Sequence, residues 1–176
     1  MFSDISQSPL KKNLRRLFLL RNISIAIQCL TIGLVYRTID IALPWTALII
    51  VVALLTILNF ATWLRLYRNW PVSNLEFFLQ LLIDVFALSA LLYFSGGSTN
   101  PFISLFLLPL TIAAAVLPWR YTWVMATFTI GCYTLLLFNY IPLPHDHSKH
   151  LVEFNLHVSG MWLTFVLSTL IIAWFV

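Results

Sequence analysis

The sequence predicts an all-α membrane protein, a bundle of six transmembrane helices with both termini in the cytoplasm. Of its 176 residues, 61% are hydrophobic and only 9% are charged, whereas a soluble domain carries about 25% charged residues. The apolar runs are continuous, which is typical of membrane helices and unlike the alternating pattern of a membrane β-barrel. The basic residues supply the third observation, because they separate cleanly into two groups once six segments are allowed to cross the bilayer.

Six segments provide the predicted spans, since a helix of about 20 apolar residues crosses roughly 30 Å of hydrocarbon. They cover residues 17–38, 45–66, 75–94, 101–117, 119–140 and 154–176. The fourth is the shortest. Residues 1–16 are then expected to form a cytoplasmic N-terminal segment, and residues 17–176 a single six-helix domain.

Lysine and arginine residues set the predicted orientation, because they concentrate on the cytoplasmic side of a membrane. Arg37 and Lys149 fall on one side, and the other eight fall on the opposite side: Lys11, Lys12, Arg15, Arg16, Arg21, Arg65, Arg68 and Arg120. The net charge of +4 is thus a topology signal and does not indicate a nucleic-acid partner. We expect a multi-pass membrane protein, with the lipid bilayer as its solvent.

Polar side chains form one stripe along each of two predicted spans. Residues three or four apart share a helix face, and this spacing relates Glu76, Gln80 and Asp84, and likewise Arg21, Ser24, Gln28 and Thr31. Both spans start from the same side, which places Arg21 near the depth of Gln80. The stripes would either join helices through hydrogen bonds or make Asp84 a proton-coupled or ligand-sensing group.

Three further groups of residues could have a structural or a functional role. Gly160, Thr164 and Ser168 recur every four residues in the last span, which suits either packing within the bundle or a dimer seam. The outside loop contains His145, His147 and His150. Their side chains would either be solvated or act as zinc ligands, and we expect no metal. Cys29 and Cys132 have no metal-ligand spacing and are expected to be small buried hydrophobes.

The turn between the third and fourth spans, SGGSTNPF, is the most polar stretch inside the apolar sequence. Gly96 or Gly97 can adopt the left-handed conformation that ends a helix. Asn100 is a good N-cap, and Pro101 suits the first position of the next helix. The local chemistry therefore predicts a helix stop, a tight turn and a helix start.

Gly96 to Phe102 also match the GGxxNPF heptapeptide, by which the chain resembles the RegB/PrrB-type redox-responsive sensor histidine kinases. That family has six membrane spans with cytoplasmic ends and carries the heptapeptide in the same outside turn. The resemblance implies a multi-pass domain of the bacterial inner membrane that senses ubiquinone through Gly96, Gly97, Asn100, Pro101 and Phe102. A quinone ring could approach the glycine backbone, accept a hydrogen bond from the Asn100 amide and pack against Phe102.

The resemblance also implies a homodimeric parent protein whose cytoplasmic kinase phosphorylates a response regulator. The phosphoacceptor histidine and the ATP-binding glycine motifs are not recognisable in these 176 residues, so the chain itself is not expected to catalyse phosphoryl transfer. Its apolar last segment, STLIIAWFV, would lead into that output domain. Two other hypotheses remain at this point: a small six-span transporter or transporter subunit, and a structural assembly factor.

Overall fold

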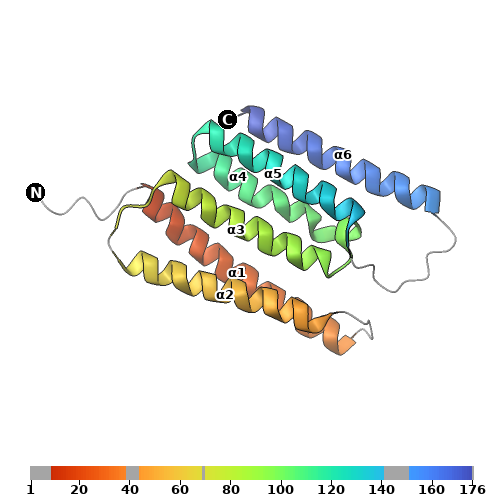
Figure 1. The fold of residues 1–176 in the computed structure, drawn as a ribbon, viewed down its shortest axis with the longest axis horizontal. Helices are drawn as coiled ribbons and strands as arrows, with labels where there is room; N and C mark the ends of the chain where they lie inside the picture. The colour runs from red at the N-terminus through yellow and green to blue at the C-terminus, as the bar shows by residue number, and fades with distance from the viewer. Residues whose placement is uncertain (1–8, 39–43, 69, 141–150, 176) are drawn as a thin grey trace, which may run out of the picture. The chain divides into compact units, whose positions relative to one another are not determined.

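The chain is α-helical throughout the residues that the computed structural model describes, which are 9–38, 44–68, 70–140 and 151–175. Two short 3₁₀ segments, η2 and η3, stand between the third and fourth α-helices (Figure 1). The helices are α1 (Pro9–Thr38), α2 (Trp45–Tyr67), α3 (Asn74–Tyr93), η2 (Gly97–Thr99), η3 (Pro101–Phe106), α4 (Leu107–Val116), α5 (Trp119–Phe138) and α6 (Leu151–Phe175). They divide into two compact units. The residues of α3 up to Gln80 belong to the first unit, and the residues of α3 after Gln80 belong to the second.

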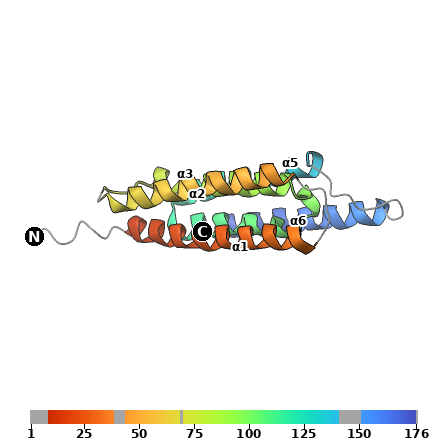
Figure 2. The same ribbon diagram turned by 90° about the horizontal axis from the view of Figure 1, so that it is seen from below.

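The first unit contains α1, α2 and the start of α3. Helices α1 and α2 lie side by side and antiparallel (Figures 1 and 2). The edge-to-face contact of Tyr36 with Trp45 near one end, at 5.3 Å between ring centroids, fixes their register. The hydrogen bond from Asn59 to Asn22, at 2.8 Å, fixes it again about four turns further along. This pairing brings the basic start of α1 level with the basic end of α2.

The second unit contains the rest of α3, both 3₁₀ segments and α4 to α6. Helices α4, α5 and α6 pack against one another, and α5 runs antiparallel to both neighbours (Figure 1). The core is aromatic at its centre, where the buried rings of Phe106, Tyr133 and Phe165 meet edge to face with centroids 6.3 and 5.0 Å apart. Phe86 of α3 packs in the same way on Phe128 of α5, at 4.9 Å.

The fourth span begins as a 3₁₀ helix, and Pro109 explains why. Proline has no N–H to give the carbonyl of Leu105, so an α-helical ladder lacks a bond here and is weakened on the N-terminal side of this position. The Leu107 N–H donates to the Ser104 carbonyl, the three-residue spacing of a 3₁₀ helix. Because the rise is greater, the sixteen residues Pro101–Val116 reach about 27 Å, against about 24 Å if they were α-helical throughout.

The predicted all-α fold is confirmed, and five of the helices are long and apolar enough to cross a membrane, with Phe102–Val116 as a shorter apolar helix. Their outward faces are apolar: Leu30 is 71% exposed and Ile57 is 63% exposed. Such a surface requires lipid as its solvent. Helix α1 begins at Pro9, eight residues before the predicted span, because Leu14 and Leu17 are buried and continue its packed face.

Candidate functional site

Both glycines of the heptapeptide take the left-handed backbone conformation, with φ of 104° at Gly96 and 59° at Gly97. These are the only positive φ angles in the described part of the chain. Glycine adopts them without the penalty that a Cβ brings. The predicted helix stop is therefore real, and it uses both glycines in succession to turn the chain from α3 into η2.

Gly97 also lies in direct contact with Tyr140, which follows α5. A Cβ placed on Gly97 would overlap Cβ and Cγ of the tyrosine side chain. The turn and the end of α5 thus meet at a point where only glycine fits, and η2 packs on α5 as a result. The sequence pattern did not identify Tyr140, because it lies 43 residues from its partner and no motif connects the two.

Asn100 closes the turn through three hydrogen bonds. Its Oδ1 accepts from the Phe102 N–H at 2.9 Å, which confirms the predicted N-cap. Its Nδ2 donates to the Ser95 carbonyl at 2.8 Å and to the Ser95 hydroxyl at 2.9 Å. Both amide hydrogens are therefore already used, so the expected hydrogen bond from Asn100 to a quinone carbonyl requires the exchange of a bond to Ser95.

Phe102 and Leu105 present an apolar surface beside this turn. They are 49% and 43% exposed, while Ile103 and Phe106 between and after them are buried. Side chains three apart line up in a 3₁₀ helix, so the two exposed residues stand one above the other on η3. Pro101 occupies the first position of η3, as predicted. Gly96 and Gly97 are buried beside this surface, so the turn offers a ligand the exposed ring of Phe102 and not the glycine backbone that the sequence predicted.

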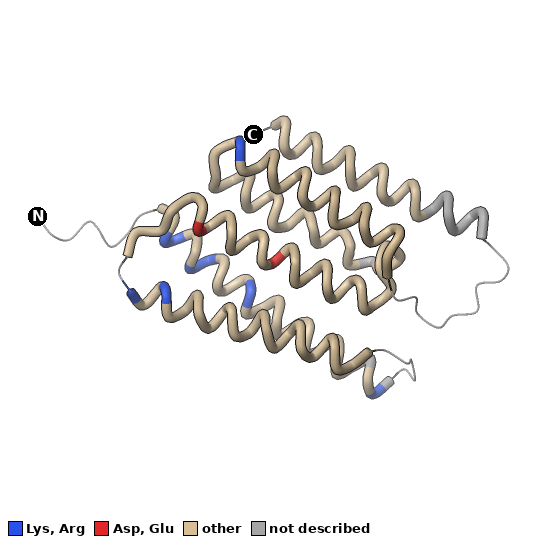
Figure 3. The backbone as a smooth tube through the Cα atoms, in the orientation of Figure 1, with Lys and Arg blue, Asp and Glu red and all other residues tan. Residues whose placement is uncertain are grey.

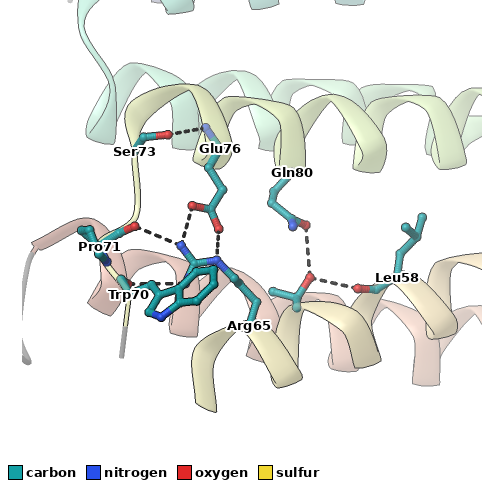
Figure 4. A network of polar contacts seen from close by, with 8 residues as sticks. Leu58, Arg65, Trp70, Pro71, Ser73, Glu76 and Gln80 are labelled. Carbon is teal, nitrogen blue, oxygen red and sulfur yellow. Dashed lines mark hydrogen bonds and ion pairs between the residues drawn. The ribbon is translucent and has the colours of Figure 1, made fainter. Parts of the chain in front are cut away.

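A buried polar cluster lies in the first unit, where the sequence placed Arg21 at the depth of Gln80. The Arg21 side chain is 3% exposed. Its guanidinium donates to Oε1 and to the backbone carbonyl of Gln80, each at 3.0 Å, and to the Thr62 hydroxyl at 3.3 Å. The Thr62 hydroxyl donates in turn to the Leu58 carbonyl of its own helix and lies 3.2 Å from Gln80 Oε1 (Figure 4). The cluster joins α1, α2 and α3 within the membrane span.

The connection between α2 and α3 is held by Arg65 (Figure 4). Its guanidinium forms a two-pronged ion pair with Glu76, at 2.8 and 2.9 Å, and donates to the Pro71 carbonyl at 2.9 Å. The Glu76 N–H donates to the Ser73 hydroxyl at 3.1 Å, which caps the start of α3. Glu76 is thus explained by a structural contact at the helix end.

The remaining predicted polar residues are distributed between the units. Asp84 is half-buried on the part of α3 that belongs to the second unit. Gln28 is half-buried on α1, and its Oε1 atom is buried with no hydrogen-bond partner among the described residues. Ser24, predicted on the same stripe, faces outward. The Asn59–Asn22 bond and Thr62 were not predicted, although both asparagines interrupt apolar runs.

Gly160 and Thr164 are exposed on α6, and a Cβ at Gly160 would have no atom within 4 Å. These two residues therefore do not pack inside the described part of the second unit, and a dimer seam stays a prediction. Cys29 is exposed, against expectation, and Cys132 is half-buried. His145, His147 and His150 lie outside the described residues, and among the described residues no group of three metal-ligating side chains occurs.

Comparison with known proteins agrees with this architecture. The family model of the PilS-like transmembrane domain, a six-span domain, matches residues 5–174. The sensor histidine kinase RegB of Cereibacter sphaeroides is 30% identical over 157 residues, which cover 89% of this chain and 34% of RegB. The chain therefore spans about a third of the length of that relative. No solved structure matches.

These matches confirm the resemblance to RegB and a multi-pass location in the bacterial inner membrane. The match extends over nearly the whole chain, well beyond the seven residues of the heptapeptide. This chain belongs to the family of PilS-like transmembrane domains.

Proposed function

We propose that this chain is the membrane input domain of a sensor histidine kinase and that it senses redox state through a membrane quinone at Gly96–Phe102. The kinase part of the proposal is supported by the similarity to the membrane-spanning third of RegB. The same similarity favours a sensor over the transporter and assembly-factor hypotheses. Both termini are proposed to be cytoplasmic, as the basic residues predict.

The observation that carries the quinone proposal is the exposed ring of Phe102 beside a turn that only glycines can form. A quinone travels in the lipid phase, so a lipid-facing aromatic side chain is accessible to it. Ring stacking on Phe102 and apolar contact with Leu105 would hold the flat head group. Aromatic pairs of this kind contribute about 0.5–1.5 kcal/mol beyond the area that they bury.

Asn100 gives this proposal a mechanism of transmission. A quinone carbonyl can take an Nδ2 hydrogen of Asn100 only if a bond to Ser95 is released. Ser95 terminates α3, and its hydroxyl donates to the Leu91 carbonyl at 2.7 Å. Quinone binding would therefore loosen the link between the end of α3 and the start of η3. The two states of this turn would differ in affinity for the ligand, which is what population shift requires.

The proposal is tested by NMR of the detergent-solubilised chain, titrated with oxidised and with reduced ubiquinone. We expect shift changes centred on the amides of residues 95–105, and weaker binding in Phe102→Ala. Phe175→Ala is the matched control, because Phe175 is 89% exposed but lies at the other end of its unit from the turn. Equal binding by all three proteins would argue against the site.

The kinase proposal is tested separately in the full-length parent protein. The Phe102→Ala substitution in the parent protein should alter the quinone response of autophosphorylation without abolishing the kinase reaction. A parent gene that continues into a transport domain would overturn the assignment whatever the quinone experiment shows.

A further inference from the structure

Basic residues gather at one end of the first unit, from two helices that run antiparallel (Figure 3). Thr62 of α2 lies beside Arg21 of α1. Six residues further along α2 is Arg68, and six residues back along α1 is Arg15, so these two stand at the same level. Lys12 and Arg16 flank Arg15 on α1. The end of the unit therefore carries a concentrated positive charge.

Arg65 and Arg68 differ in how that charge is used. Arg65 is neutralised by its two-pronged ion pair with Glu76. Arg68 is exposed, and its guanidinium lies over the ring of Trp70 at 5.6 Å from the centroid. Lys12, Arg15 and Arg16 are exposed as well. In the described part of this unit, the acidic side chain Glu76 is paired with Arg65, and none of these four basic residues contacts a carboxylate there.

An apolar aromatic face adjoins this charge. Phe60, Trp63 and Tyr67 follow one side of α2 toward its basic end, with successive ring centroids 5.5 and 6.4 Å apart. Their side chains are 57%, 47% and 82% exposed. Trp70, at 61% exposed, lies just beyond, beside both arginines. Aromatic rings of this kind favour the boundary between hydrocarbon and headgroups.

We propose that this end of the first unit, formed by Lys12, Arg15, Arg16, Arg68, Trp70 and Tyr67, binds the headgroup of an anionic phospholipid. A phospholipid is the one ligand that brings a phosphate to the arginines and, at the same time, hydrocarbon to the aromatic side of α2. Arginine suits this role because its planar guanidinium donates to two phosphate oxygens. The site is independent of the quinone proposal and lies in the other unit.

The test is native mass spectrometry of the full 176-residue chain in detergent, titrated with phosphatidylglycerol and with phosphatidylcholine of the same acyl chains. We expect tighter binding of phosphatidylglycerol, weakened about fivefold by Arg68→Gln and more by Arg15→Gln combined with Arg68→Gln, since each basic residue near a membrane surface adds a comparable factor. Arg37→Gln is the matched control, because Arg37 ends the same helix α1 at its opposite end. Arg15, Arg37 and Arg68 are all exposed, and unchanged helicity by circular dichroism will show that the variants fold.

Three results would overturn the proposal. Equal affinity for the two lipids would show that charge plays no part. A loss with Arg37→Gln as large as with Arg68→Gln would show that the charge acts without a defined site. Competition by glycerol phosphate, which has no acyl chains, at the same concentration as the lipid would show a plain anion site without a lipid contribution.

Discussion

The side chain of Tyr140 lies against the backbone of Gly97, at a place where a single added methyl group would overlap it. Tyr140 follows α5, and Gly97 opens the 3₁₀ segment between α3 and η3. The turn that carries the heptapeptide is therefore fixed to a helix that is distant in sequence. Any movement of the turn must be accompanied by a movement of Tyr140 or of the end of α5.

We predict that Gly97→Ala lowers the stability of the domain, both because alanine at a φ of 59° costs about 1–2 kcal/mol and because its Cβ meets Tyr140. The melting temperature in detergent measures this loss. The control is Gly131→Ala, since Gly131 is helical and open, and the change should stabilise by about 0.5–1 kcal/mol. Adding Tyr140→Gly to Gly97→Ala should recover part of the loss, because glycine at 140 removes the overlapping Cβ and Cγ but leaves the strained φ at residue 97. No recovery would mean that the contact has no energetic weight.

Replacement of Asn100 should separate its two structural roles. Asn100→Ala removes the cap and both bonds to Ser95, and loss of such a cap costs about 0.5–2 kcal/mol. Asn100→Asp keeps the acceptor for the Phe102 N–H but has no donor for Ser95, so we expect an intermediate melting temperature. A double-mutant cycle with Ser95→Ala isolates the coupling between the two residues. Additive effects of the two changes would contradict the proposed link.

Thr62→Val should destabilise the first unit, because Thr62 supports both Arg21 and Gln80. Interhelical hydrogen bonds in membranes are worth about 0.6–2 kcal/mol, and we expect a loss of that size in the free energy of unfolding. Thr56→Val is the matched control on the same helix, since the Thr56 hydroxyl donates to the Val52 carbonyl one turn earlier in its own helix. Equal losses from the two variants would show that the cluster around Arg21 adds nothing beyond the local contact.

The ion pair between Arg65 and Glu76 should hold the first turn of α3. Both side chains are about a quarter exposed, so the pair is screened in part by solvent, and we expect a coupling of about 1 kcal/mol in a double-mutant cycle of Arg65→Gln and Glu76→Gln. Hydrogen exchange at the amides of residues 74–78 should become faster in either single variant. Unchanged exchange would show that Ser73 alone caps the helix.

The sequence was sufficient to predict the main helices because length and hydrophobicity dominate in lipid. Helix α1 ends at Thr38, α2 begins at Trp45 and α5 begins at Trp119, each as predicted. The helical start of α1 at Pro9 was missed, because Leu10, Leu14 and Leu17 are interspersed with charged residues and give only a weak apolar run. The 3₁₀ form of Pro101–Phe106 was missed because apolar side chains are compatible with either helix.

The turn shows the same division between local and tertiary information. Gly96, Gly97, Asn100 and Pro101 each occupy the backbone role that their chemistry predicts. What a sequence pattern cannot provide is the identity of partners far along the chain, and so Tyr140 beside Gly97 and Thr62 beside Arg21 were not identified. The hydrogen bonds of Asn100 to Ser95 join residues only five apart. They were missed because the N-cap role already explained an asparagine at this position.

The narrow winding of Pro101–Phe106 has a mechanical consequence. Rewinding these six residues into the wider α-helical form would draw the two ends together by about 3 Å and rotate one end against the other by about 120°, from the differences in rise and twist. This 3₁₀ segment directly precedes α4, so its winding sets the rotation of α4 about the helix axis. A change at the turn that rewound this segment would therefore rotate α4 about its own axis.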